Sequence, residues 1–149
     1  MKKTLVLGMG NLLLRDEGVG VHAAHALMRA GVPEGVTVLD IGTAILEALP
    51  QLEKAARVIV IDAIKADGAP GSVYRIPFEE CARKETIGSM HGFDLARVLA
   101  LTRRKAPPEV IVLGIEPLEI TWSLELSPPV QEALPFLLEA VGKEIAAER

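Results

Sequence analysis

Residues 5–27 read LVLGMGNLLLRDEGVGVHAAHAL, in which an apolar strand passes through a glycine-containing turn into a helix. The run Leu5-Val6-Leu7 lacks polar alternation, as expected for a parallel strand that is covered on both faces. The turn Gly8-Met9-Gly10-Asn11 follows, and the acidic pair Asp16-Glu17 stands before a helix that is expected to end at Gly31. This strand–turn–helix opening predicts an α/β fold.

The rest of the chain repeats the alternation of strands and helices. Further strands are expected at residues 36–40, 57–62, 72–77 and 110–114, and further helices near 43–52, 89–104 and 128–149. No helix separates the strands 57–62 and 72–77, so the second of these is expected to be antiparallel. Thr43 and Ser127 are expected to cap helices. The sequence therefore predicts a three-layer α/β/α sandwich around a mostly parallel five-stranded sheet, in a single domain over residues 1–149.

Composition limits the classes of function. Half of the 149 residues are hydrophobic, but no apolar run approaches the roughly 18 residues that span a bilayer. Cys81 is the single cysteine, which fits a reducing compartment. The net charge of −4 and the scattered Lys and Arg show no nucleic-acid footprint. We expect a cytoplasmic monomer with no membrane insertion and no nucleic-acid partner.

Acidic residues gather where the predicted parallel strands end. Ligands of such sheets bind beyond the carboxyl ends of the strands. Those ends carry Asp16 with Glu17, then Asp40, Asp62 and Glu116. Like charges repel at short range unless a proton or a cation lies between them, so this edge is a candidate cation site.

His91 adds a possible nitrogen ligand at the expected start of the helix near 89–104. A helix N-terminus disfavours imidazolium, which predicts a neutral, metal-binding imidazole. Glu17, Asp62 and His91 would form a two-carboxylate, one-histidine set that suits nickel or zinc. Local structure offers another interpretation, in which Asp16 caps a helix and Glu17 is a first-turn residue that the helix dipole favours. Spacing alone leaves both open.

Two other features also have alternative interpretations. Gly8 and Gly10 either allow a tight turn or begin a dinucleotide fingerprint, but Leu13 stands where the third glycine belongs. His22 and His25 either chelate a metal or lie with Arg29 on a solvated helix face. We favour the tight turn and the solvated face. Cys81 is expected to be a packed or half-exposed helix residue.

The motifs together resemble the hydrogenase maturation endopeptidases over nearly the whole chain. The run from Gly8 to Gly20 follows the family's opening pattern, G-x-G-N-x-L-x-x-D-[DE]-x-x-G. Asp40-Ile41-Gly42-Thr43 resembles its D-G-G-T turn, and Asp62 and His91 match its strand-end aspartate and its histidine. Gly114-Ile115-Glu116-Pro117 and Leu126-Ser127-Pro128 resemble the closing motifs.

The resemblance implies an endopeptidase that removes the C-terminal extension of a nickel–iron hydrogenase large-subunit precursor after nickel insertion. It implies metal binding by Glu17, Asp62 and His91, with the divalent metal being nickel carried by the substrate. It implies a catalytic or substrate-handling role for Asp40, and substrate binding by Gly42 and Thr43. Ile41 departs from the family's glycine, and its β-branched side chain restricts the turn that places Asp40.

The mechanism expected from this resemblance is recognition of the nickel that the substrate carries, followed by attack of an activated water on the peptide carbonyl. Two rival functions are a metal-binding chaperone that holds the precursor without cutting it, and a nucleotide-binding α/β enzyme. Cleavage of the precursor distinguishes the first rival, and nucleotide binding distinguishes the second.

Overall fold

The computed structural model describes residues 3–81 and 88–147. Five strands form the main sheet in the order β2-β1-β3-β6-β4, with β1, β2, β3 and β6 parallel and β4 antiparallel to β6. Their bounds are β1 Thr4–Met9, β2 Val36–Gly42, β3 Arg57–Lys65, β4 Val73–Pro77 and β6 Glu109–Ile115. A further strand of two residues, β5 (Gly88–Ser89), pairs antiparallel with the end of β3. The predicted mixed five-stranded sheet and its antiparallel strand are confirmed.

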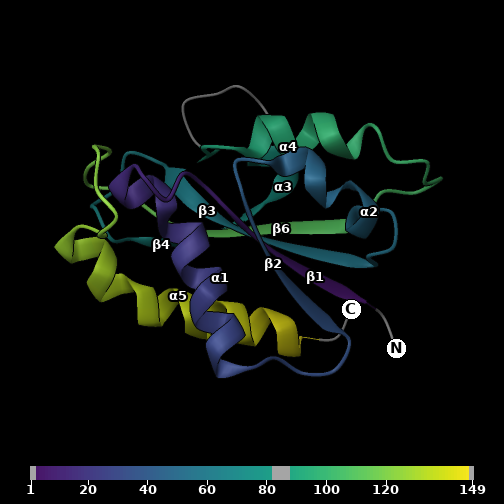
Figure 1. Ribbon diagram of the computed structural model, residues 1–149, viewed down its shortest axis with the longest axis horizontal. Helices are drawn as coiled ribbons and strands as arrows, with labels where there is room; N and C mark the ends of the chain where they lie inside the picture. Colours follow the sequence, from purple (N-terminus) through teal and green to yellow (C-terminus); the bar gives the residue numbers. More distant parts are fainter. Residues whose placement is uncertain (1–2, 82–87, 148–149) are drawn as a thin grey trace.

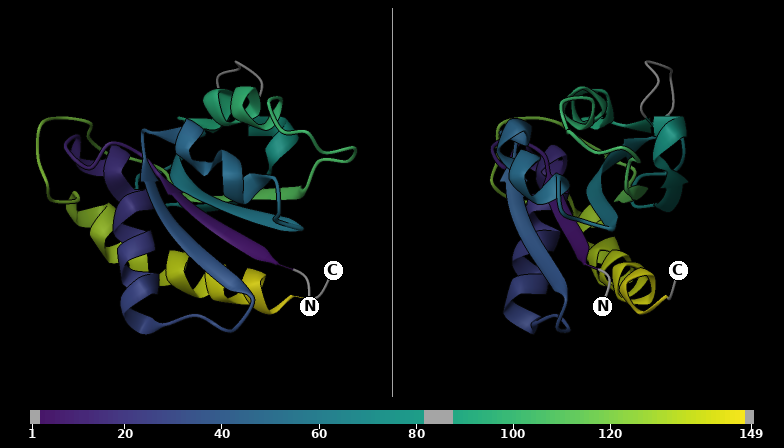
Figure 2. Two further views of the ribbon diagram at one scale, coloured as in Figure 1. Left: turned by 45° about the vertical axis from the view of Figure 1, so that its right-hand side comes forward. Right: turned by 90° about the vertical axis from the view of Figure 1, so that its right-hand side faces the viewer.

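Helices cover both faces of this sheet (Figure 1 and Figure 2). One face packs against α1 (Val19–Ala30) and α5 (Pro128–Ala146). The other packs against α2 (Leu49–Leu52), α3 (Phe78–Cys81) and α4 (Gly92–Leu99). Two 3₁₀ turns, η1 (Arg15–Gly18) and η2 (Ile45–Ala48), precede α1 and α2. Each layer contributes apolar side chains to its own core, so the α/β/α sandwich is confirmed.

Glycines bring α1 unusually close to the sheet. A Cβ at Gly20 would overlap the carbonyl oxygens of Met9 and Ile61, and a Cβ at Gly8 would overlap Gly20 and Ala24. Gly10 has a φ of +138°, and a Cβ there would overlap the carbonyl oxygen of Glu17. The glycines therefore hold η1 directly over the carboxyl ends of β1 and β3.

The ends of several elements differ from the sequence-based expectation. The helix expected near 89–104 is regular only over Gly92–Leu99, and the helix expected from residue 17 begins at Val19 after η1. Thr43 does not cap η2, whose N-cap residue is Ala44. Ser127 holds the N-cap position of α5 without a side-chain cap hydrogen bond, and its hydroxyl is donated to Asp16. Gly31 ends α1 as expected.

Within residues 3–81 and 88–147, no helix is both long enough and apolar enough to cross a bilayer.

Candidate active site

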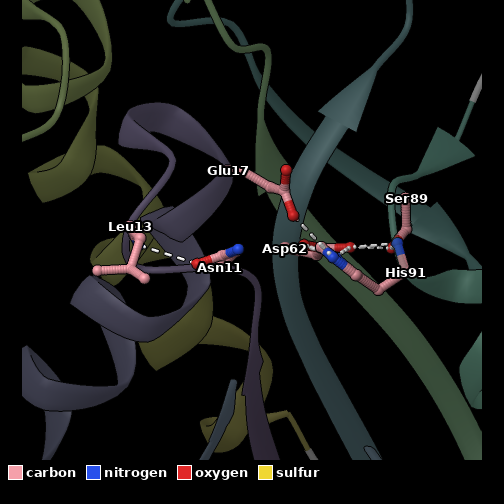
Figure 3. Close-up of polar contacts among 6 residues, drawn as sticks. All are labelled: Asn11, Leu13, Glu17, Asp62, Ser89 and His91. Carbon is pink, nitrogen blue, oxygen red and sulfur yellow. Dashed lines mark hydrogen bonds and ion pairs between the residues drawn. The ribbon is translucent and has the colours of Figure 1, made fainter. Parts of the chain in front are cut away.

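Glu17, Asp62 and His91 meet at the carboxyl edge of the sheet (Figure 3). Asp62 lies on β3, Glu17 on η1, and His91 at the N-cap position of α4. Nδ1 of His91 lies 2.9 Å from Oδ1 of Asp62, and Nε2 of His91 lies 3.1 Å from Oε1 of Glu17. The imidazole therefore bridges the two carboxylates, and the three residues predicted from sequence are brought together.

Asp62 is fully buried and is held by its neighbours on β5 and α4. Its Oδ2 accepts the backbone N–H of His91 at 2.9 Å and also the hydroxyl of Ser89. Met90 N–H is donated to the carbonyl of Ala63 at 3.1 Å, which continues the pairing of β5 with β3. Sequence reasoning missed Ser89, whose only signal was its place two residues before His91. The pairing of the short β5 strand with β3 therefore positions His91 over Asp62.

The protonation expected for His91 was wrong. Burial by itself lowers the pKa of His91, but the hydrogen bond and charge of Asp62, and then the charge of Glu17, outweigh burial and raise the pKa from 6.5 to about 9. At neutral pH the side chain is an imidazolium that donates to both carboxylates. Two full charges at hydrogen-bond distance outweigh the partial charge of a helix N-terminus.

Asn11 points its side chain toward this cluster from the turn after β1. Its Oδ1 accepts the backbone N–H of Leu13 at 3.0 Å. Because a backbone N–H needs an oxygen acceptor, this bond fixes which end of the carboxamide is which. The NH₂ group is thereby turned toward Asp62 and His91, as Figure 3 shows. The site therefore has a fixed neutral donor beside its charged groups.

Asp40 lies apart from these residues. It pairs with Gly8 across the β1–β2 ladder, while the next ladder pair is Met9 with Gly42, so Ile41 is the extra residue of a bulge. The Ile41 side chain packs into the core under α2 and α4. Asp40 points to the opposite face, where its Oδ2 lies 2.6 Å from Nε2 of His25 on α1.

The D-I-G-T turn continues past this bulge. Gly42 adopts a left-handed φ of +55°, and its carbonyl accepts the N–H of Gly10 at 3.0 Å. Thr43 is exposed at the same end of the sheet. The turn is thus tied to the opening motif through Gly10. The roles of Asp40, Gly42 and Thr43 stay predictions.

Asp16 is a structural carboxylate that the sequence did not reveal. It is fully buried. Its Oδ1 accepts Ser127 N–H at 2.8 Å, and its Oδ2 accepts Leu118 N–H and Glu119 N–H at 2.9 Å and the Ser127 hydroxyl at 2.6 Å. The loop 116–127 is therefore fastened to η1. Because Asp16 bonds to this loop, the expectation that it caps a helix was wrong.

Glu116 also turns away from the candidate cation site. Its Oε1 accepts the N–H groups of Ala66 and Gly68 and the hydroxyl of Tyr74, each at 2.9 Å. It therefore orders the β3–β4 turn. Of the acidic residues expected at the carboxyl edge, Glu17 and Asp62 share one site, while Asp16 and Glu116 hold loops.

The helix face with His22 and His25 is only partly solvated. Arg29 is exposed, as expected, whereas both histidines are half-buried. Burial, followed by the charge of His25, lowers the pKa of His22. His25 pairs with Asp40, which the helical periodicity could not indicate. Cys81 is buried in the core, as expected, and burial raises the pKa of its thiol.

The donor set fits a divalent cation by its chemistry, since two carboxylates and one imidazole are common ligands of first-row metals. The arrangement seen is held by hydrogen bonds. No group of three His, Cys, Asp or Glu side chains in residues 3–81 and 88–147 is laid out as a ready metal cage. Binding through His91 requires one of its nitrogens to release its proton to solvent and to exchange its carboxylate partner for the cation.

A cavity of about 790 Å³ lies at the other end of the sheet, beside Thr4, Val36 and Arg57. Arg57 donates to Oε1 of Glu144 at 2.8 Å, so its charge is neutralised within the fold. The titratable groups that could perform chemistry lie at the carboxyl edge instead, which is where ligands of parallel sheets bind. Glu17, Asp62 and His91 are therefore the candidate functional site.

The fold is a doubly wound α/β sheet, and two carboxylates and one imidazole cluster at its carboxyl edge. This combination is typical of enzymes whose active sites lie beyond the carboxyl ends of parallel strands. The model of the hydrogenase maturation protease family (HycI) matches residues 21–144. The chain belongs to this family and is an endopeptidase.

Similar proteins and solved structures support the same family. The chain is 35% identical over 144 residues to the hydrogenase 2 maturation protease of Escherichia coli K12, covering 93% of this chain and 88% of the relative. It is 36% identical over 138 residues to HupD of Bradyrhizobium diazoefficiens, covering 89% and 72%. The fold matches the hydrogenase maturating endopeptidase HybD of E. coli with a TM-score of 0.83 and 32% identity, over 96% of this chain and 91% of that one. It matches HybD of Thermococcus kodakarensis, a [NiFe] hydrogenase maturation protease, with a TM-score of 0.80 and 30% identity, over 96% and 99%.

Proposed function

We propose that this protein removes a C-terminal extension from the large-subunit precursor of a nickel–iron hydrogenase, after nickel has been inserted. Membership of the family supports a hydrogenase precursor as substrate. The observation that carries the nickel requirement is the meeting of Glu17, Asp62 and His91 at one accessible edge, with the His91 nitrogens 2.9 and 3.1 Å from the two carboxylates. We place the enzyme in the cytoplasm as a monomer.

In this proposal the nickel is part of the substrate. Glu17 and His91 would approach it first, because their side chains are 13% exposed, whereas that of Asp62 is fully buried. Bound nickel would supply Lewis-acid polarisation and a fixed reference point on the precursor. The protein's own contribution is positioning, since one bound point beside the scissile bond converts a bimolecular encounter into an oriented one.

Asn11 would serve the carbonyl of the scissile bond. Its carboxamide orientation is set by Leu13 N–H, so its NH₂ donors need no reorganisation when negative charge develops on a carbonyl oxygen. Asp40, Gly42 and Thr43 would contact the substrate at the neighbouring end of β2. His25 would act there as a positioning residue that holds the Asp40 carboxylate 2.6 Å from its ring.

The direct test incubates the purified enzyme with its precursor prepared with and without nickel, and follows the precursor mass by mass spectrometry. Loss of a fixed C-terminal mass from the nickel-loaded form alone supports the proposal. Equal cleavage of both forms would contradict nickel recognition, and binding without any mass loss would point to a chaperone. His91→Gln should abolish processing, while Asp94→Asn, an exposed carboxylate on α4, should retain it.

A further inference from the structure

An exposed apolar surface lies beside the site, on the segment just before η1 and on the loop 116–127. We call it the apolar rim, and it consists of Leu13, Trp122 and Leu124. These side chains are 52%, 79% and 61% exposed. Trp122 is the only tryptophan of the chain. A tryptophan so exposed is costly to hydrate and is a residue type that dominates binding energy at protein interfaces.

The two segments of the rim are joined by backbone hydrogen bonds. Ser123 N–H is donated to the carbonyl of Leu13 at 2.9 Å, and Arg15 N–H to the carbonyl of Ser123 at 3.0 Å. Leu13 is thus held against the residue that separates Trp122 from Leu124. The same two segments lie side by side at the left end of the molecule in Figure 1 and in the left view of Figure 2. The rim is one surface, although its members are far apart in sequence.

The rim is also held in place before any partner binds. Asp16 accepts four hydrogen bonds from the loop 116–127, including three from backbone N–H groups. Ordering a loop on binding costs free energy, and a loop that is already fixed avoids most of that cost. An exposed apolar loop that the protein anchors with a buried carboxylate is a prepared binding surface.

The position of the rim relative to the site identifies its occupant. Leu13 belongs to the segment that carries both Asn11 and Glu17, and Figure 3 shows Asn11 between Leu13 and Asp62, with Glu17 beside His91. A polypeptide substrate bound at His91 would lie close to this segment. We propose that the apolar rim docks an apolar segment of the hydrogenase precursor next to the bond that is cut. This inference rests on the proposed function and adds a recognition surface to it.

A second copy of the chain fits the rim less well. Stable dimers usually bury about 800 Å² on each partner, which three side chains cannot supply. A small apolar contact suits a substrate that is also held at the active site and must leave after each turnover. The rim therefore adds affinity for the precursor without making a permanent complex.

The test uses the full-length enzyme and its nickel-loaded precursor. Trp122→Ala should raise the KM for processing about 10-fold or more, because a central aromatic contact dominates such interfaces, and Leu124→Ser should raise it by a smaller factor. In both variants kcat should stay within about twofold of wild type. Phe136→Ala is the matched control, since Phe136 on α5 is 66% exposed but lies outside the rim. It should leave both constants unchanged.

A spectroscopic measurement accompanies the kinetics. Enzyme labelled with 5-fluorotryptophan has one fluorine signal, from Trp122, whatever tryptophans the precursor contains. This signal should shift when the precursor is added. An unchanged KM in both rim variants, or a loss carried by kcat alone, overturns the inference. A shift that follows enzyme concentration without precursor also overturns it, by showing self-association. If wild-type enzyme leaves the precursor uncut, the proposed function itself fails, which is a distinguishable result.

Discussion

Replacing Asp16 with asparagine tests whether a buried carboxylate holds the loop 116–127 on the active-site turn. The side chain keeps its size and loses one acceptor oxygen. Asp16 receives four donors, three at one oxygen and Ser127 N–H at the other. Asparagine can keep its oxygen toward the three, but its NH₂ then faces Ser127 N–H. At least one buried backbone donor is left unpaired.

The expected loss in the free energy of unfolding follows from these contacts. An unpaired buried donor costs about 1–3 kcal/mol, and each remaining bond weakens by about 0.5–1 kcal/mol when its acceptor becomes neutral. The lower desolvation of a neutral amide offsets part of this loss. We expect Asp16→Asn to lower the free energy of unfolding by about 3 kcal/mol, which for a chain of this size is a fall in Tm of roughly 6–12 °C.

Calorimetry measures the fall in Tm, and amide hydrogen exchange locates it. Leu118 and Glu119 N–H should lose protection before the strands do. Ser127→Ala removes one hydroxyl donor and leaves the three backbone donors in place, so it should cost only about 1 kcal/mol. A Tm for Asp16→Asn within about 2 °C of wild type would refute the assignment of Asp16 as the anchor of this loop.

Three further outcomes are expected. The pKa of His91 is raised from 6.5 to about 9, so protonated His91 contributes about 3 kcal/mol to the free energy of unfolding. This contribution is complete below pH 6.5 and is lost as the pH rises through 9. Urea unfolding in the presence of a chelator, at pH 6 and pH 10, should show this loss in wild type and not in His91→Asn. Asn11→Asp keeps the acceptor for Leu13 N–H but removes the NH₂ donor, and kcat should fall about 100-fold with KM nearly constant in steady-state assays of precursor cleavage; an unchanged kcat would remove Asn11 from the site. Gly20→Ala would force a Cβ into the carbonyls of Met9 and Ile61, so thermal unfolding should show a loss of about 3 kcal/mol, and a wild-type Tm would contradict the close packing of α1.

Periodicity and motif spacing determined the architecture of this protein. Apolar runs without alternation indicated parallel strands, and the missing helix before β4 indicated its antiparallel direction; both were confirmed. The rule that ligands bind beyond strand ends also predicted that Glu17 and Asp62 lie at one edge of the sheet, and the structure brings both side chains to His91 there. These inferences succeed because they depend on local pattern and on chain direction, which the sequence states directly.

Only the tertiary structure decided what each polar group does. Asp16 and Glu17 are neighbours in sequence, but one is buried under a distant loop and the other faces His91. Charge and hydrogen bonding from β3 and η1 fix the protonation of His91, against the local influence of its helix. Asp40 meets His25 of α1, on the face of the sheet opposite Asp62. Such outcomes depend on contacts between segments up to about a hundred residues apart, and no local pattern contains them.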